Sequence, residues 1–122
     1  MKVVIDIKIL KNQLDEVVSF EISGHANHSA YGTDIVCAAI STLSQVITYS
    51  LHIESNYQIQ FTISEEPSMV KCHIPEYPYC TEEERKKYNV LLNALFLGVE
   101  SITGQYKDYI NLEIKGGSKN DN

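Results

Sequence analysis

Apolar and polar residues alternate along five short stretches of the chain, which is the pattern of half-buried β-strands. The stretches are Val3–Leu10, Val17–Ser23, Tyr57–Ser64, Met69–Ile74 and Tyr106–Ile114. Polar turn residues separate the first stretch from the second and the third from the fourth. The pattern therefore predicts two hairpins and a single final strand.

Two longer segments carry apolar residues at steps of three and four, which is typical of amphipathic helices. The first helix is predicted from Ile35 to about Ile53. The second begins after Thr81, which forms a capping-box pattern with Glu84, and is expected to run to about Thr103 with Gly104 as its stop. Its expected buried residues are Leu91, Leu92, Leu95, Val99 and Ile102.

The order ββαββαβ predicts an α/β (α+β) two-layer sandwich. We expect a five-stranded mixed or largely antiparallel sheet with both helices on one face. Residues 1–115 would form a single domain, and 116–122 a polar, disordered tail. The open face of the sheet is expected to show apolar residues such as Val4 and Leu10, which would suit a homodimer.

Composition narrows the class of protein. The 122 residues suffice for one modest core. We see no apolar run near the roughly 20 residues that span a bilayer, and the start of the chain reads as a strand instead of a signal peptide, so we expect a soluble, cytoplasmic protein. A net charge of −6 argues against nucleic-acid binding. It would suit a basic polypeptide substrate, or it only aids solubility.

The three cysteines do not suggest a disulfide framework, because their number is odd and no export signal precedes them. Cys72 and His73 invite a metal site, but neighbours in a strand point to opposite faces and no second pair follows at ligand spacing. We therefore expect no metal and no cofactor, and Cys72 as a small buried side chain.

The candidate chemistry lies between Ser23 and Ser41. His25 ends an alternating segment, and Cys37 lies in the first turn of the first helix. With Asp34 as N-cap, Cys37 is at position N3, where the helix dipole favours a thiolate. Lowering a thiol pKa from about 8.5 to about 7 requires roughly 2 kcal/mol, whereas a helix terminus supplies about 0.3–1 kcal/mol. A second positive partner is needed, and His25 is the nearest candidate.

Other residues of this stretch leave alternatives open. His28 is a rival base. Gly24 and Gly32 flank the loop as hinges or as fixed turns, and the loop from Ala26 to Thr33 is a candidate lid over a bound peptide. Ser41 lies one turn after Cys37, either as a hydroxyl near the thiol or as part of a close-packed stripe of small residues completed by Ser44 and Thr48. Helix-start amides, that of Cys37 included, are candidate oxyanion donors.

This stretch resembles the signature of the bacterial ribosomal-processing cysteine proteases (Prp). The resemblance rests on Gly24-His25-Ala26, Tyr31-Gly32, and Asp34-Ile35-Val36-Cys37-Ala38-Ala39 with Ser41. It implies that His25 and Cys37 form a catalytic dyad and that Asp34 and Ser41 support them, Asp34 by capping the helix or by orienting His25. It also implies a cytoplasmic, homodimeric endopeptidase that removes a short N-terminal extension from a large-subunit ribosomal protein.

Two rival functions remain. In a non-catalytic ribosome-assembly or peptide-binding module, Cys37 would be only a buried helix residue, and a peptide would add to a sheet edge. In a thiol redox protein, Cys37 would pair with Cys72 or Cys80, although no C-x-x-C motif is present.

Overall fold

The computed structural model describes residues 5–24, 33–56, 58–65, 68–75 and 79–117. The elements follow the predicted order ββαββαβ. They are β1 (Ile5–Lys11), β2 (Val17–Ser23), α1 (Thr33–Glu54), β3 (Gln60–Glu65), β4 (Ser68–His73), α2 (Glu82–Gln105) and β5 (Ile110–Gly116).

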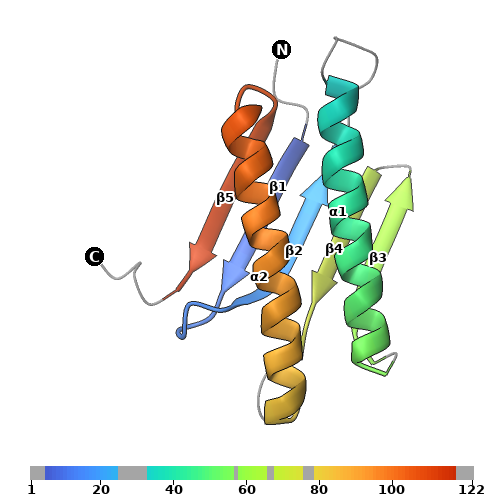
Figure 1. Ribbon diagram of the computed structural model, residues 1–122, viewed down its shortest axis with the longest axis vertical. Coiled ribbons are helices and arrows are strands. Elements are labelled where there is room, and N and C mark those ends of the chain that lie inside the picture. Colours follow the sequence, from blue (N-terminus) through green and yellow to red (C-terminus); the bar gives the residue numbers. More distant parts are fainter. Residues whose placement is uncertain (1–4, 25–32, 57, 66–67, 76–78, 118–122) are drawn as a thin grey trace.

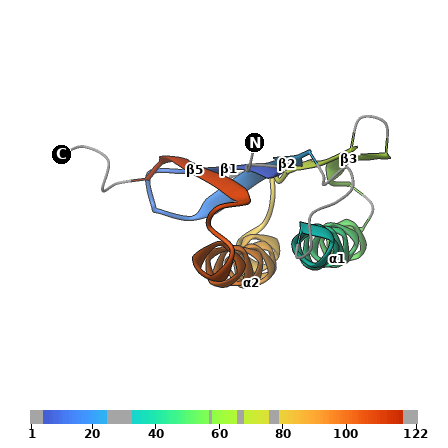
Figure 2. The same cartoon turned by 90° about the horizontal axis from the view of Figure 1, so that it is seen from above.

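The five strands form one sheet in the order β3-β4-β2-β1-β5. β1 and β5 pair in parallel, and the other neighbouring strands of this sheet are antiparallel, so the sheet is mixed. Both helices cover the same face of the sheet, side by side, with α1 on the β3 side and α2 on the β5 side (Figures 1 and 2). The predicted two-layer architecture is confirmed.

The core lies between the sheet and the two helices. Alternate strand residues such as Ile7 and Phe20 point into it, and Val36, Leu51 and Leu95 meet them from the helices. Of the side chains expected to be buried on α2, Leu92, Leu95 and Val99 are buried, whereas Leu91 and Ile102 are only partly so. Tyr88, which we did not expect there, is only 1% exposed and is among the largest core side chains.

The start of α2 confirms the predicted capping box. The Thr81 hydroxyl accepts from the Glu84 N–H at 3.1 Å, and the Glu84 carboxylate accepts from the Thr81 N–H at 2.8 Å. The predicted stop at Gly104 is wrong, because α2 continues to Gln105 and ends at Tyr106 with a φ of −129°. No left-handed residue is needed at this end, since the Tyr106 N–H still donates to the Ile102 carbonyl.

Two strands also begin later than their alternation predicted. The third strand starts at Gln60 instead of Tyr57. The last strand starts at Ile110 instead of Tyr106, because Tyr106 and Tyr109 close a turn through a 2.9 Å backbone hydrogen bond. The last strand ends at Gly116, two residues beyond the predicted end.

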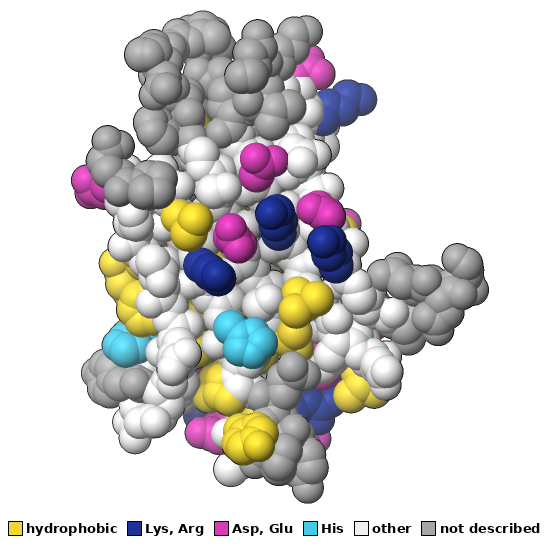
Figure 3. All heavy atoms as spheres, turned by 180° about the vertical axis from the view of Figure 1, so that it is seen from behind, with side chains coloured by type: hydrophobic (Ala, Val, Ile, Leu, Met, Phe, Trp, Pro, Cys, Tyr) yellow, Lys and Arg dark blue, Asp and Glu magenta, His cyan; other side chains and the backbone are white. Residues whose placement is uncertain are grey.

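The open face of the sheet exposes Leu10 as expected, but around it this face is largely charged instead of apolar. Cross-strand pairing places Glu113, Lys8, Glu21 and Lys71 in one row, so the sign of charge alternates from β5 to β4. Figure 3 shows both signs interleaved over this face. Leu10 is 42% exposed here, beside Ser19 and Lys115 in the register, and Val4 lies outside the described residues. Alternating charges stabilise a solvated sheet face and do not suit an apolar interface.

The apolar run in α1 is longer than we expected. By length and composition alone, Ile35–Glu54 meets the test for a membrane-spanning segment, although we expected no such run. In the structure one face of this helix packs on the sheet through Val36, Ile40 and Leu51, each at most 1% exposed. The core helix of a globular domain passes the same test, so the match alone is weak support for a membrane span.

Candidate active site

Cys37 lies in the second turn of α1. The helix begins at Thr33, which makes Asp34 its second residue and Cys37 its fifth. Asp34 is therefore not the N-cap that we predicted, and Cys37 is not at position N3. The side chain of Asp34 lies outside the described residues, so its role stays a prediction; an acid in the first turn still suits the positive end of the helix dipole.

This register changes which amides are free to bind an oxyanion. The N–H groups of the N-cap residue and of the first three helical residues have no partner within a helix. Because α1 begins at Thr33, the last of these N–H groups belongs to Ile35, and the N–H of Cys37 is not among them. The amides of Thr33, Asp34 and Ile35 are therefore the candidates, and the Cys37 amide is not. Because Cα–Cβ bonds in a helix tilt toward its N-terminus, the Cys37 thiol leans toward this first turn.

The Cys37 side chain is half-buried and packs against the edge of the core. On the same side of α1, the stripe of small residues continues into the protein. Ser44 and Thr48 are fully buried, and their hydroxyls donate to the carbonyls of Ser41 and Ser44 at 3.2 and 2.7 Å. These two residues provide close packing, while Ser41 itself is exposed one turn beyond Cys37.

The end of β2 fixes where the loop that carries His25 begins. Gly24 has a φ of +92°, and its N–H donates to the Ser68 carbonyl at 3.1 Å. This left-handed, hydrogen-bonded conformation favours the fixed turn over the hinge at Gly24. The C-terminal end of β2 and the first turn of α1 lie toward the same end of the molecule (Figure 1). His25, His28 and Gly32 lie outside the described residues.

The other two cysteines are placed away from solvent. Cys72 is 2% exposed, and burial raises its pKa to about 12. Cys80 is buried just before α2. No disulfide joins any of the three. A thiol with this pKa is inert at neutral pH, which weakens the redox hypothesis for Cys72.

No metal cluster is present in the part of the chain that the structure describes. Cys72 is buried and His73 exposed on β4, so they point to opposite faces as the strand period predicted. Two hollows of about 400 and 360 Å³ lie between the β1–β2 turn and α2, and a third of about 440 Å³ lies on the open sheet face. Cys37 lines none of these three.

Comparison with known proteins identifies the family. The chain matches the family described as "Cysteine protease Prp" over residues 4–111. It is 26% identical over 96 residues to the ribosomal processing cysteine protease Prp of Bacillus subtilis (strain 168), which covers 79% of this chain and 84% of that protein.

Solved structures share the fold. The crystal structure of SMU.848 from Streptococcus mutans is similar with a TM-score of 0.76 and 25% identity, covering 93% of this chain and 96% of that one. The essential ribosomal processing protease Prp from S. aureus, in complex with a substrate peptide, has a TM-score of 0.71 and 19% identity, covering 91% of this chain and 99% of that one. Because the family match covers residues 4–111, and because the fold and the place of Cys37 near the start of α1 agree with it, the chain belongs to the cysteine protease Prp family.

Proposed function

We propose that the chain is an endopeptidase in which His25 and Cys37 form the catalytic dyad. The observation that carries the proposal is the position of Cys37, whose Cα–Cβ bond tilts toward the start of α1, where the first amides have no partner within the helix. β2 ends two residues before His25 in the sequence, and its C-terminal end lies toward the same end of the molecule as the start of α1 (Figure 1). This arrangement supports the proposal that a base, a nucleophile and oxyanion donors act together at one end of the fold.

The reaction proceeds through an acyl-enzyme. His25 takes the proton of Cys37, and the thiolate attacks the scissile carbonyl carbon. The amides of Thr33, Asp34 and Ile35 hold the oxyanion of the tetrahedral intermediate. His25 then protonates the leaving amine, the C–N bond breaks, and water hydrolyses the thioester to free the thiol and a carboxylate.

We propose as substrate a large-subunit ribosomal protein with a short N-terminal extension, cleaved in the cytoplasm. The name of the B. subtilis relative supports a ribosomal substrate. The net charge of −6 suits a basic ribosomal protein. Following the sequence-based expectation, we also propose that the protein acts as a homodimer.

The test is to incubate the purified protein with the unprocessed ribosomal protein and to read the products by intact mass. We expect one cleavage, lost in Cys37→Ala and in His25→Ala. Matched controls are Cys80→Ala, His28→Ala and His73→Ala, which remove the same groups elsewhere and should retain cleavage. Thermal melting shows whether each variant is folded.

Each other result has a distinct meaning. Cleavage that survives Cys37→Ala excludes this cysteine as the nucleophile. Loss in His28→Ala with retention in His25→Ala moves the base to His28. A substrate that binds the folded wild type but stays intact supports the peptide-binding module instead.

A further inference from the structure

The hollow on the open face of the sheet, about 440 Å³ in volume, has more positive than negative side chains around it. Apart from three buried core residues, it is lined by Lys8, Leu10, Ser19, Glu21, Lys71, His73 and Lys115. The three lysines are exposed, whereas the single glutamate is half-buried. The whole chain, in contrast, carries 16 acidic and 10 basic residues. The net charge of −6 therefore does not describe this part of the surface, which we call the open-face hollow.

The charges of these lysines are not neutralised by strong ion pairs. Glu21 lies between Lys8 and Lys71 in the strand register, but neither ammonium group forms an ion pair with any residue that the structure describes. Lys115 pairs with Glu113 at 3.5 Å, where the two side chains are 67% and 44% exposed. Exposed pairs of this kind contribute little and are screened by salt. All three lysines are therefore available to an anionic partner.

The positive side chains lie on two sides of the open-face hollow. Lys8 and Lys115 come from the paired strands β1 and β5. Lys71 and His73 are two residues apart on β4, and β2 lies between the two sides. At about 4.8 Å per strand, the backbones of Lys8 and Lys71 are roughly 10 Å apart. A partner with several anionic groups along its length reaches both sides at once.

The side chains around the open-face hollow suit phosphate groups better than a protein surface. Protein interfaces have an apolar centre that is rich in aromatic residues and poor in lysine. Leu10, at 42%, is the only exposed large hydrophobic side chain among the described residues that line the hollow. Lysine and serine, in contrast, are regular donors to the phosphate oxygens of nucleic acids.

The lining also favours an RNA duplex over a single strand. Proteins that bind single strands stack the bases on aromatic side chains. Among the described residues of the lining, the only Phe, Tyr or Trp is Phe20, which is 2% exposed. Double-stranded RNA is recognised largely through its shape and its backbone, so it requires no such rings.

We infer that the open-face hollow binds the phosphate backbone of double-stranded RNA. The inference rests on the ribosomal substrate proposed above, since an enzyme that processes a ribosomal protein works beside structured RNA. It replaces the expectation against nucleic acid that we drew from the net charge. Both helices, and with them Cys37, lie on the other face of the sheet (Figure 2), so RNA and a peptide at Cys37 occupy different surfaces.

Fluorescence anisotropy of a labelled RNA hairpin, titrated with the whole chain, tests the inference. The wild type should bind at low salt. The logarithm of its affinity should fall against the logarithm of the salt concentration with a slope of about −3, for three phosphate contacts. Lys8→Gln and Lys71→Gln should each weaken binding several-fold and make the slope shallower by about one. Circular dichroism checks that each variant folds.

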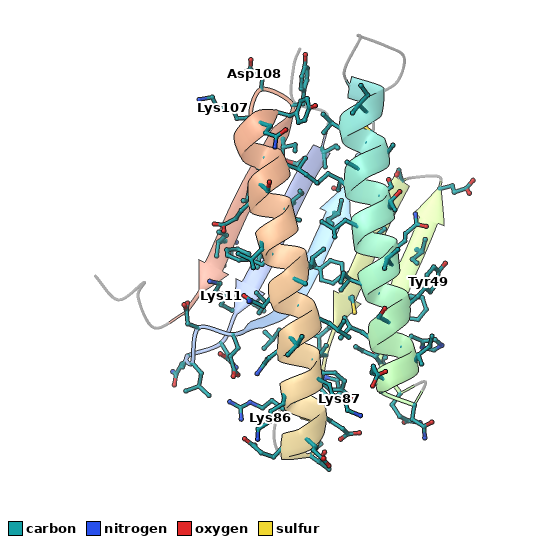
Figure 4. The ribbon with its side chains drawn as sticks, in the orientation of Figure 1. Lys11, Tyr49, Lys86, Lys87, Lys107 and Asp108 are labelled. Atoms are coloured by element: carbon teal, nitrogen blue, oxygen red, sulfur yellow. The ribbon has the colours of Figure 1, made fainter. Side chains whose placement is uncertain are left out.

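Lys86→Gln is the matched control. It removes the same charge from an exposed position of α2, on the helix side of the sheet (Figure 4). Neither the affinity nor the salt slope should change in this variant. A single-stranded RNA of the same length should bind more weakly than the hairpin, and equal binding of the two would overturn the assignment to a duplex.

The remaining outcomes are distinct. A wild type that does not bind the hairpin at low salt overturns the inference, as does a double variant of Lys8→Gln and Lys71→Gln that binds as well as wild type. Binding to polyglutamate but not to the hairpin assigns the hollow to an acidic protein and overturns it too. The cleavage assay is run separately, without RNA. Cleavage without RNA binding leaves the proteolytic proposal standing, whereas RNA binding without cleavage overturns only that proposal.

Discussion

The guanidinium of Arg85 on α2 binds the carboxylate of Glu16, which lies 69 residues earlier, just before β2. Arg85 Nη2 donates to Glu16 Oε2 at 2.8 Å, and Nε donates to Oε1 at 3.3 Å. Asn89 and Asn12 donate to the same carboxylate at 2.8 and 3.1 Å. This cluster fastens the first hairpin to the second helix, at the end of α2 that is remote from the start of α1 (Figure 1).

Glu16→Gln should make the stability depend less on pH. Burial raises the pKa of Glu16, but the hydrogen bonds from Asn12, Arg85 and Asn89 and the charge of Arg85 outweigh it and hold the pKa below its ordinary value. A lowered folded-state pKa contributes stability above the unfolded pKa of about 4.3 and loses it as the pH falls through the folded value. Thermal melts should show a lower Tm for Glu16→Gln at pH 7 and convergence with wild type in strong acid. Glu100→Gln, an exposed acid on α2, serves as the control.

Thr81→Ala should destabilise the domain by about 1 kcal/mol, because it removes the hydroxyl that accepts from the Glu84 amide. Urea unfolding followed by circular dichroism measures the change. Thr81→Ser keeps the capping oxygen and should stay within a few tenths of a kcal/mol of wild type. Equal losses in the two variants would mean that the threonine methyl, and not the cap, is responsible.

Gly104→Ala should stabilise the domain by about 0.5–1 kcal/mol. The residue is inside α2, and an added Cβ meets nothing within 4 Å. Gly98→Ala in the same helix is the contrasting variant, since its Cβ would come within 2.6 Å of Leu43 Cδ2 on α1. Urea unfolding should show the gain only at Gly104. A gain of the same size at Gly98 would mean that the Leu43 side chain on α1 can move aside without a cost in stability.

Asp34→Asn should leave most of the cleavage rate intact if the side chain only supports the start of α1, because Asn also serves helix starts well. If the carboxylate orients His25, the rate should fall by orders of magnitude. Steady-state cleavage of the ribosomal substrate distinguishes the two roles. We expect the first result, since Asp34 is the second residue of α1.

The native protein should present Cys37 as its reactive thiol. Burial raises the pKa of Cys72 to about 12, so this thiol should react with a disulfide reagent only after unfolding. Stopped-flow titration with such a reagent should show a fast phase that Cys37→Ala removes and Cys72→Ala leaves unchanged. A fast phase lost in Cys72→Ala would show that β4 opens readily.

The period of apolar residues was enough to predict every strand and helix, because each element buries one face and its sequence shows it. The ends were harder to predict. Gly104 looked like a stop, yet α2 continues past it because the following turn satisfies its last carbonyls through Tyr106. Thr33 gave no stronger helix-start signal than Asp34, so the sequence did not show that α1 begins at Thr33. The exact start matters because it decides which amides have no partner within the helix.

The candidate site was predicted from residues that are close together in the sequence, and the fold was predicted from the period of apolar residues. The character of a sheet surface, in contrast, depends on which distant strands pair. Leu10 looked like part of an apolar face until the register placed Ser19 and Lys115 beside it. The Glu16–Arg85 cluster left no local signal, since its members are 69 residues apart.

The parallel pairing of β1 with β5 has a consequence for how the domain forms. Asn111 donates to Asp6 across this pair, over 105 residues of chain. Until β5 arrives, the backbone groups along one edge of β1 lack their final partners, and the buried Ile5, Ile7 and Ile9 have a neighbouring strand on the β2 side alone. Loop closure over such a length is slow, and an open strand edge invites association with other chains. Completion of this sheet thus has to wait for a segment 105 residues further along the chain, and its rate sets how long the domain remains prone to aggregation.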